Sequence, residues 1–124
     1  MLLMTPPNGQ TDTPLRPVEF YVLLGLVEDD LHGYGIIQRT EQQSDGRIRL
    51  DPGTLYRAIR RLREGGLVEH APRRAAEDLE DGRQRRYYRL TPTGRDVAER
   101  EARRIANLAR DAINAGLIDK AELG

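Results

Sequence analysis

One segment near the middle of the chain carries a complete set of helix signals. Asp51 can cap the free amides of a helix start, and Pro52 suits the first helical position. The pair Gly65-Gly66 can supply the left-handed residue that ends a helix. The apolar residues between these boundaries fall within one arc of about 100°, which predicts a helix with a single packing face. They are Leu55, Ala58, Ile59 and Leu62.

The opposite side of this predicted helix is basic. The segment from Arg57 to Glu64 holds four arginines against one glutamate, and a second cluster, from Arg83 to Arg89, holds four arginines and no acid. A helix fits the major groove of DNA, and a hairpin wing can follow the backbone or the minor groove, so the two clusters predict binding to double-stranded DNA. The candidate DNA-binding residues are Thr54, Tyr56, Arg57, Arg60 and Arg61 in the helix, Arg83, Arg85 and Arg86 in the wing, and Tyr34 in the preceding helix.

The chain as a whole is electrically neutral, with 20 basic and 20 acidic residues. This balance argues against a histone-like protein that coats DNA without specificity, so the local clustering of charge carries the prediction. Two alternatives stay open. The helix arginines could form a solvated face, and the wing arginines could neutralise the acids from Glu77 to Asp81.

Individual residues also have competing interpretations. Arg60 or Arg61 is the expected guanine contact, because a guanidinium fork matches the O6 and N7 acceptors of that base. Arg63 lies nearer the apolar boundary and could pair with protein instead. For Tyr56, phosphate contact and packing against the preceding helix are equally favoured, whereas for Tyr34 packing is favoured over a phosphate contact.

Catalysis, metal binding and membrane insertion find little support. The chain has no cysteine and two histidines, His32 and His70, and it has no nucleophile-elbow, Walker or His-Glu-x-x-His motif. We therefore expect no enzyme activity, no cofactor and no metal; His32 is expected to cap a helix start. The N-terminus lacks an export signal and the run from residue 22 to 27 is too short to span a bilayer, which predicts a cytoplasmic protein without membrane contact.

The order of elements predicts a mainly α fold with a small antiparallel β wing, a winged helix-turn-helix. Tyr87 and Tyr88 are expected to brace the sheet rather than to stack on single-stranded bases. In the second helix, Ile36, Ile37 and Thr40 should face inward. The expected elements are a helix at 18–28, a helix from about 33 to 44, a short strand at 48–50, the basic helix, a strand at 67–71, a polar loop at 73–84 and a strand at 85–90. The expected units are a flexible tail at 1–15, the DNA-binding domain at 16–91, a dimerisation helix at 92–115 and a tail at 116–124.

Thr91-Pro92 repeats the cap-then-proline signal, so the last helix should begin at Pro92 and run for about 35 Å. Its apolar residues recur at heptad-like spacing, and such a helix is too long for the small domain to cover. A partner chain in a symmetric homodimer is the favoured cover; a helix folded back on its own domain is the alternative. The candidate dimerisation residues are Ala98, Ala102, Ile105, Leu108, Ala109 and Ala112.

Three stretches of the chain, in this order, resemble the PadR family of bacterial transcriptional regulators. The resemblance covers roughly residues 18 to 100. The stretches are Leu31-His32-Gly33-Tyr34 with Ile36-Ile37; Leu50 to Tyr56, continuing through Arg61-Leu62 to Gly65-Gly66-Leu67-Val68; and Arg85 to Thr91 with Gly94-Arg95.

The resemblance implies a dimeric winged-helix repressor that binds a palindromic operator and is often released by a small-molecule effector. Two features depart from the family pattern. Arg57 stands where many relatives have a second proline, which adds a basic group near the groove. Some small relatives bind flat aromatic compounds between tryptophans at the dimer interface, and this chain has no tryptophan.

Two other classes of function compete with this prediction. A winged-helix module could use its arginine face to bind an acidic protein partner without binding DNA. A small ligand-binding enzyme is the weaker alternative. Retardation of a DNA duplex would separate the regulator from the protein-binding module, and turnover that survives loss of the arginines would support the enzyme.

Overall fold

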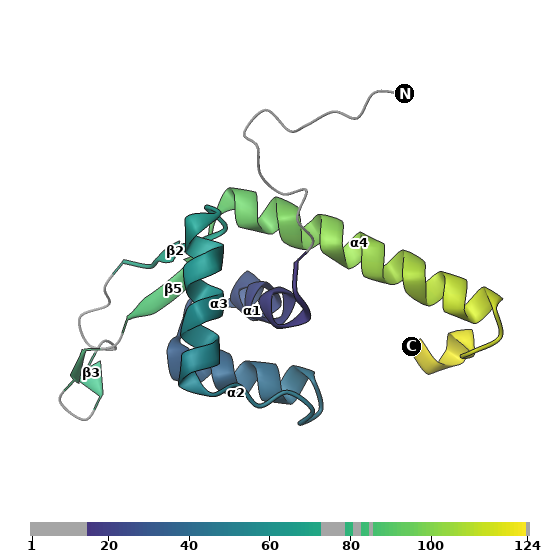
Figure 1. Ribbon diagram of the computed structural model, residues 1–124, viewed down its shortest axis with the longest axis horizontal. Coiled ribbons are helices and arrows are strands. Elements are labelled where there is room, and N and C mark those ends of the chain that lie inside the picture. The colour runs from purple at the N-terminus through teal and green to yellow at the C-terminus, as the bar shows by residue number, and fades with distance from the viewer. Residues whose placement is uncertain (1–14, 73–78, 81–82, 85, 124) are drawn as a thin grey trace.

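The computed structural model describes residues 15–72, 79–80, 83–84 and 86–123. Residues 1–14 of the predicted tail and much of the predicted loop at 73–84 therefore lie outside the described residues, whereas Leu15, the last residue of the predicted tail, is partly buried and packs against the core. In the described part the fold is mostly helical with a small antiparallel sheet, which confirms the predicted fold class (Figure 1). The helices are α1 Pro17–Glu28, α2 Gly33–Gln43, α3 Pro52–Glu64, α4 Pro92–Asn114 and the 3-10 helix η1 Lys120–Leu123; the strands are β1 Leu31–His32, β2 Val68–His70, β3 Leu79–Glu80, β4 Arg83–Gln84 and β5 Tyr87–Leu90.

Side chains cap the starts of α2, α3 and α4, as the sequence signals predict. Asp51 Oδ1 accepts a hydrogen bond from the Thr54 amide (2.8 Å), and Thr91 Oγ1 accepts one from the Gly94 amide (2.9 Å). His32 caps α2, because its Nδ1 accepts a hydrogen bond from the Gly35 amide (3.0 Å). Each bond satisfies a backbone donor that the helix itself leaves free.

The central sheet has three strands in the order β1-β5-β2, and all neighbours are antiparallel. The predicted strand at 48–50 is wrong. Both edges of β5 are already paired, by β1 and β2, and the Ile48 amide instead donates to Ser44 Oγ (2.9 Å). The segment predicted as a polar loop also contains a short antiparallel hairpin of β3 and β4, in which Leu79 pairs with Gln84.

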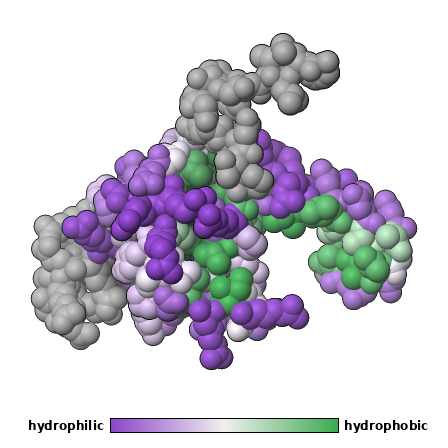
Figure 2. Space-filling model, viewed as in Figure 1, coloured by the Kyte–Doolittle hydropathy of each residue, from purple (hydrophilic) through white to green (hydrophobic). Residues whose placement is uncertain are grey.

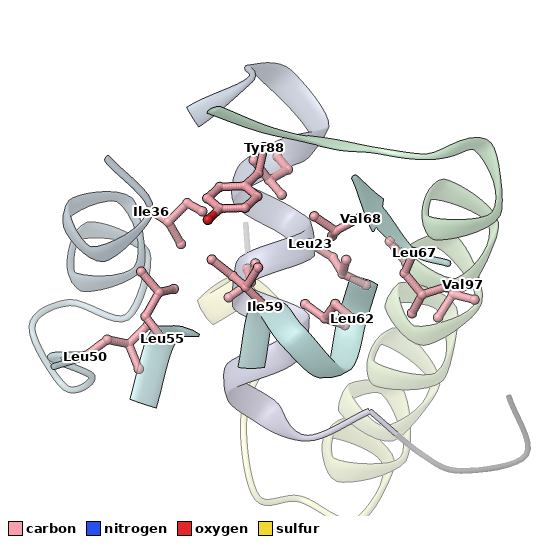
Figure 3. Packing of buried hydrophobic residues seen from close by; sticks show 13 residues of the cluster. Leu23, Ile36, Leu50, Leu55, Ile59, Leu62, Leu67, Val68, Tyr88 and Val97 are labelled. Atoms are coloured by element: carbon pink, nitrogen blue, oxygen red, sulfur yellow. The ribbon is translucent and has the colours of Figure 1, made fainter. Parts of the chain in front are cut away.

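Helix α1 lies at the centre of the molecule, and α2, α3, α4 and β5 all pack against it. Figure 3 shows side chains from these elements meeting around Leu23. Leu23 and Leu55 are fully buried, and burying a side chain of this size stabilises the fold by roughly 1.5–3 kcal/mol. In α2, Ile36 and Thr40 are buried as predicted, and Ile37 is partly buried and packs against the core. Tyr88 is 6% exposed, so its predicted role in bracing the sheet is confirmed.

The first turn of α4 lies directly against the turn that follows α3. Thr91 Oγ1 donates a hydrogen bond to the Gly66 carbonyl oxygen (2.6 Å), and the Thr91 amide donates to the Leu67 carbonyl oxygen (3.1 Å). A Cβ atom on Gly94 would overlap the same Leu67 oxygen. The two helices are therefore joined at a contact that leaves no space for a side chain.

Beyond this joint, α4 extends away from the rest of the domain (Figure 1). Val97 and Ala98 belong to the buried core, whereas Ile105 is 40% exposed and Leu108 is 54% exposed. The helix ends close to the predicted residue, but the segment predicted as a tail at 116–124 differs. Gly116 adopts a left-handed backbone (φ 82°), and the chain after it forms η1.

Candidate nucleic-acid interface

Helix α3 divides into a buried face and a basic face. Leu55, Ile59 and Leu62 lie in the core, while Arg57 and Arg60 are exposed on the opposite side. Figure 2 shows hydrophilic residues gathered over the part of the surface where α3 lies. The core contacts fix the rotation of α3 about its axis, so the exposed arginines face away from the domain.

A chain of hydrogen bonds organises the start of α3. Arg57 Nη2 donates to Thr54 Oγ1 (3.2 Å), and Thr54 Oγ1 donates to Asp51 Oδ2 (3.0 Å). The bond from the Thr54 amide is the main cause that lowers the pKa of Asp51 below its usual value, with the Thr54 hydroxyl next. The Arg57 guanidinium is thus held over the first turn of α3.

Arg61 contacts protein rather than pointing freely outward. Its Nε donates to Glu19 Oε2 (2.7 Å), and the Glu19 side chain is 4% exposed. Glu19 Oε1 also accepts the Arg16 amide at the start of α1 (2.8 Å). The sequence leaves open a protein partner for Arg63, but the structure gives such a partner to Arg61, and Arg63 is exposed. An acid in the first turn of α1 was the available signal, but nothing in the sequence places that turn beside α3.

We expect Arg61→Ala to lower the free energy of unfolding by about 1–2 kcal/mol, because it leaves the buried Glu19 carboxylate without its cation. The loss stays below that of a fully buried pair, since the Arg61 side chain is 43% exposed and solvent screens its charge. Urea unfolding measures the difference. Arg60→Ala is the matched control and should leave stability unchanged; equal stability of the two variants would contradict a structural role for Arg61.

The two tyrosines near the start of α2 differ in their surroundings. Tyr56 is 50% exposed, and its hydroxyl lies so close to Gly33 that a Cβ there would come within 2.7 Å of it. Tyr56 therefore packs over the first turn of α2 and still presents half of its surface. Packing was the favoured prediction for Tyr34 and is wrong, because that side chain is 58% exposed.

At the wing, Glu69 and Arg89 form a cross-strand ion pair (2.7 Å), and Arg86 is exposed immediately before β5. Arg83 is on β4, where the structure describes the backbone alone. Arg85 lies outside the described residues. Tyr87 is partly buried, and its ring contacts the ring of His32 edge-on at a centroid distance of 5.3 Å. Arg86 is therefore the one wing candidate whose side chain the structure describes, and it is exposed immediately before β5.

The described residues bring together no group of three side chains that could hold a metal ion. In the same part of the chain, no helix has both the length and the apolar character needed to cross a membrane.

The helix pair α2 and α3, followed by the antiparallel strands β2 and β5, defines a winged helix-turn-helix, a class of fold that typically binds DNA. A family model described as the PadR-like family of transcriptional regulators matches residues 22–100. The chain is 33% identical over 96 residues to transcriptional regulator Rv3488 of Mycobacterium tuberculosis, covering 77% of this chain and 82% of that protein. The chain belongs to the PadR-like family.

Two further similarities differ in extent. Over 102 residues the chain is 40% identical to an uncharacterized 37.1 kDa protein in transposon TN4556 of Streptomyces fradiae, covering 82% of this chain but 27% of that protein. The chain therefore spans about a quarter of the length of this relative. The crystal structure of Bacillus subtilis PadR in complex with operator DNA shares the fold, with a TM-score of 0.59 at 16% identity over 70% of this chain and 48% of that chain.

Proposed function

We propose that this protein is a homodimeric, sequence-specific repressor that binds a palindromic operator in the cytoplasm. The observation that carries the proposal is the exposed arginine face of α3, whose apolar back is fixed in the core beside a basic wing. Membership of a family of transcriptional regulators supports the proposal. The crystal structure of Bacillus subtilis PadR, which shares the fold and contains operator DNA, supports it as well.

In this proposal α3 enters the major groove, and its exposed residues have different roles. Arg60 makes the guanine contact, because it is exposed and its guanidinium fork matches the base edge. Arg57 contacts phosphate at the start of the helix, and Thr54, whose amide and hydroxyl both donate to Asp51, positions Arg57 by accepting a hydrogen bond from its guanidinium. Arg61 holds α3 against α1 through Glu19, which makes it a positioning residue. Tyr56 and Tyr34 add contacts from the exposed surface near α2, and Arg83, Arg85 and Arg86 contact the backbone from the wing.

The second copy of the chain covers the apolar surface of α4. Figure 2 shows hydrophobic residues along the distal part of α4 and at the C-terminal end of the chain. Ala98 is 6% exposed and packs in its own core, so the proposed dimer surface begins one turn later. It consists of Ala102, Ile105, Leu108, Ala109 and Ala112. Two-fold symmetry would present one α3 to each half of a palindrome.

A small-molecule effector would act by linkage. A ligand that binds the DNA-free arrangement of the dimer more tightly lowers operator affinity by the ratio of its affinities for the two states. The proposal does not need an aromatic pocket between tryptophans, which this sequence cannot build.

Selection of bound fragments from random duplex DNA tests the proposed function. We expect the purified chain to enrich an inverted repeat with half-sites about 10 base pairs apart, or a multiple of that spacing. Failure to retain any duplex, together with tight binding to an acidic protein, would reject the proposal and favour a protein-interaction module.

The Arg60→Ala variant tests the helix contact. We expect a loss of about 1–3 kcal/mol in binding to the selected duplex, concentrated at one base position, because the guanine loses its bidentate partner. Fluorescence anisotropy on the selected duplex and on single-base variants measures it. Equal discrimination by wild type and Arg60→Ala at every position would contradict a base contact by Arg60.

A further inference from the structure

Three basic side chains gather where the wing joins the domain, beside one flank of α3. His70 on β2 lies opposite Tyr88 on β5, and their rings stand 5.1 Å apart between centroids. Arg86 precedes Tyr88 by two residues and so belongs to the same side of the extended chain. Arg63 lies in the last turn of α3, which packs against β2. We call these residues the Arg63–His70–Arg86 cluster.

The surroundings of His70 are cationic. Partial burial is the main cause that lowers the pKa of its imidazole below the ordinary value, and the charges of Arg63 and Arg86 lower it further. Tyr88 is neutral at physiological pH, because burial raises the pKa of its phenol. The neighbouring acid, Glu69, alternates to the other face of the strand and binds Arg89. His70 is therefore uncharged near neutral pH, with two arginines acting on it.

Arg63 and Arg86 are exposed and His70 is partly exposed, so the cluster is open to an anion. It also lies between the helix α3 and the wing, the two elements that contact DNA in the proposed function. A phosphate placed here would accept hydrogen bonds from both guanidinium groups and would cancel the positive potential that disfavours a charged imidazole.

We propose that the Arg63–His70–Arg86 cluster binds a backbone phosphate of duplex DNA and that His70 takes up a proton when the phosphate binds. The inference rests on the proposed function and adds pH control to it. Since the complex holds one more proton than its free components in the titrating range, affinity for DNA rises as the pH falls. One such proton changes affinity by at most about tenfold per pH unit.

The test measures anisotropy of a labelled duplex, recovered by selection with the wild-type chain, as a function of pH. Wild type should bind roughly five- to tenfold more tightly at about pH 5.5 than at about pH 7.5, and its salt slope should be steeper by about 0.9 at the lower pH. His70→Gln keeps a polar side chain without the titration, so its affinity and salt slope should be nearly independent of pH. In NMR titrations, the apparent pKa of His70 should rise when the duplex is added.

His32→Asn is the matched control. It removes the other histidine of the chain, while asparagine retains a side-chain cap for α2. This variant should keep the full pH dependence of the wild type. Circular dichroism at both pH values checks that each variant is folded. Tight duplex binding with the same pH profile in wild type and His70→Gln would overturn the inference and leave the proposed function standing. Absence of duplex binding at every pH would instead reject the proposed function itself.

Discussion

Replacing Gly94 with alanine should lower the free energy of unfolding by about 3 kcal/mol, a large part of the stability of a domain of this size. The added Cβ would overlap the Leu67 carbonyl oxygen, which is backbone and already accepts the Thr91 amide. Relief requires α4 to move away from the α3–β2 turn, which breaks that bond and opens the core around Val97. Thermal unfolding should show a decrease of roughly 15 °C in Tm.

Gly35→Ala is the matched control for this substitution. Gly35 also lies in the first turn of a helix, but a Cβ there would make ordinary van der Waals contacts, the nearest at 3.5 Å from Leu31. Alanine is favoured over glycine in helices, so this variant should be as stable as wild type or slightly more stable. Equal stability of Gly94→Ala and wild type would show that the joint between α4 and the α3–β2 turn is not close-packed in solution.

Replacing Leu108 with glutamate should convert the proposed dimer to monomers and weaken operator binding by at least about a hundredfold. Leu108 is 54% exposed near the middle of the apolar surface of α4, and symmetry would bring two buried carboxylates into the same interface. A monomer also engages only one half-site, so it loses the gain that comes from linking two binding events. Sedimentation equilibrium and anisotropy measure the two effects.

Asn107→Glu adds the same charge one residue earlier, on the polar side of α4. Asn107 Oδ1 accepts a hydrogen bond from Arg110 (3.1 Å), and a glutamate oxygen can take over that role. This control should remain dimeric and should bind the duplex as wild type does. A Leu108→Glu variant that keeps the wild-type mass would show that another surface forms the dimer, or that the chain acts as a monomer.

The fold could be predicted from the sequence wherever the determinants are local. Asp51-Pro52 and Thr91-Pro92 mark helix starts, and the apolar spacing of α3 identifies its buried face. The third strand could not be predicted in this way. Both 31–32 and 48–50 are short enough to serve as a partner of β5, and the choice depends on where the helices place them in space. A two-residue strand has no alternation pattern to reveal it.

The candidate site was predictable in outline and less so in detail. Helical periodicity places Arg57 and Arg60 opposite the core without any knowledge of other elements. The partner of Arg61 is Glu19, 42 residues earlier in the chain, and no local pattern connects them. The sequence places His70 on a strand in a basic neighbourhood, but its relation to Arg63 and Arg86 in particular arises only when β2 pairs with β5 and packs against α3.

The close joint at Gly94 also affects how operator preference can evolve. In the proposed dimer a single uninterrupted helix connects each joint to the two-fold axis. Every residue inserted into α4 therefore turns the attached DNA-binding domain by about 100° and moves it about 1.5 Å along the helix axis. Because both copies of a homodimer carry the same insertion, most insertions would thus turn both DNA-binding domains away from the double helix. Changes in half-site spacing would therefore require α4 to lengthen or shorten by whole helical turns. Changes of a single residue in the length of α4 are excluded.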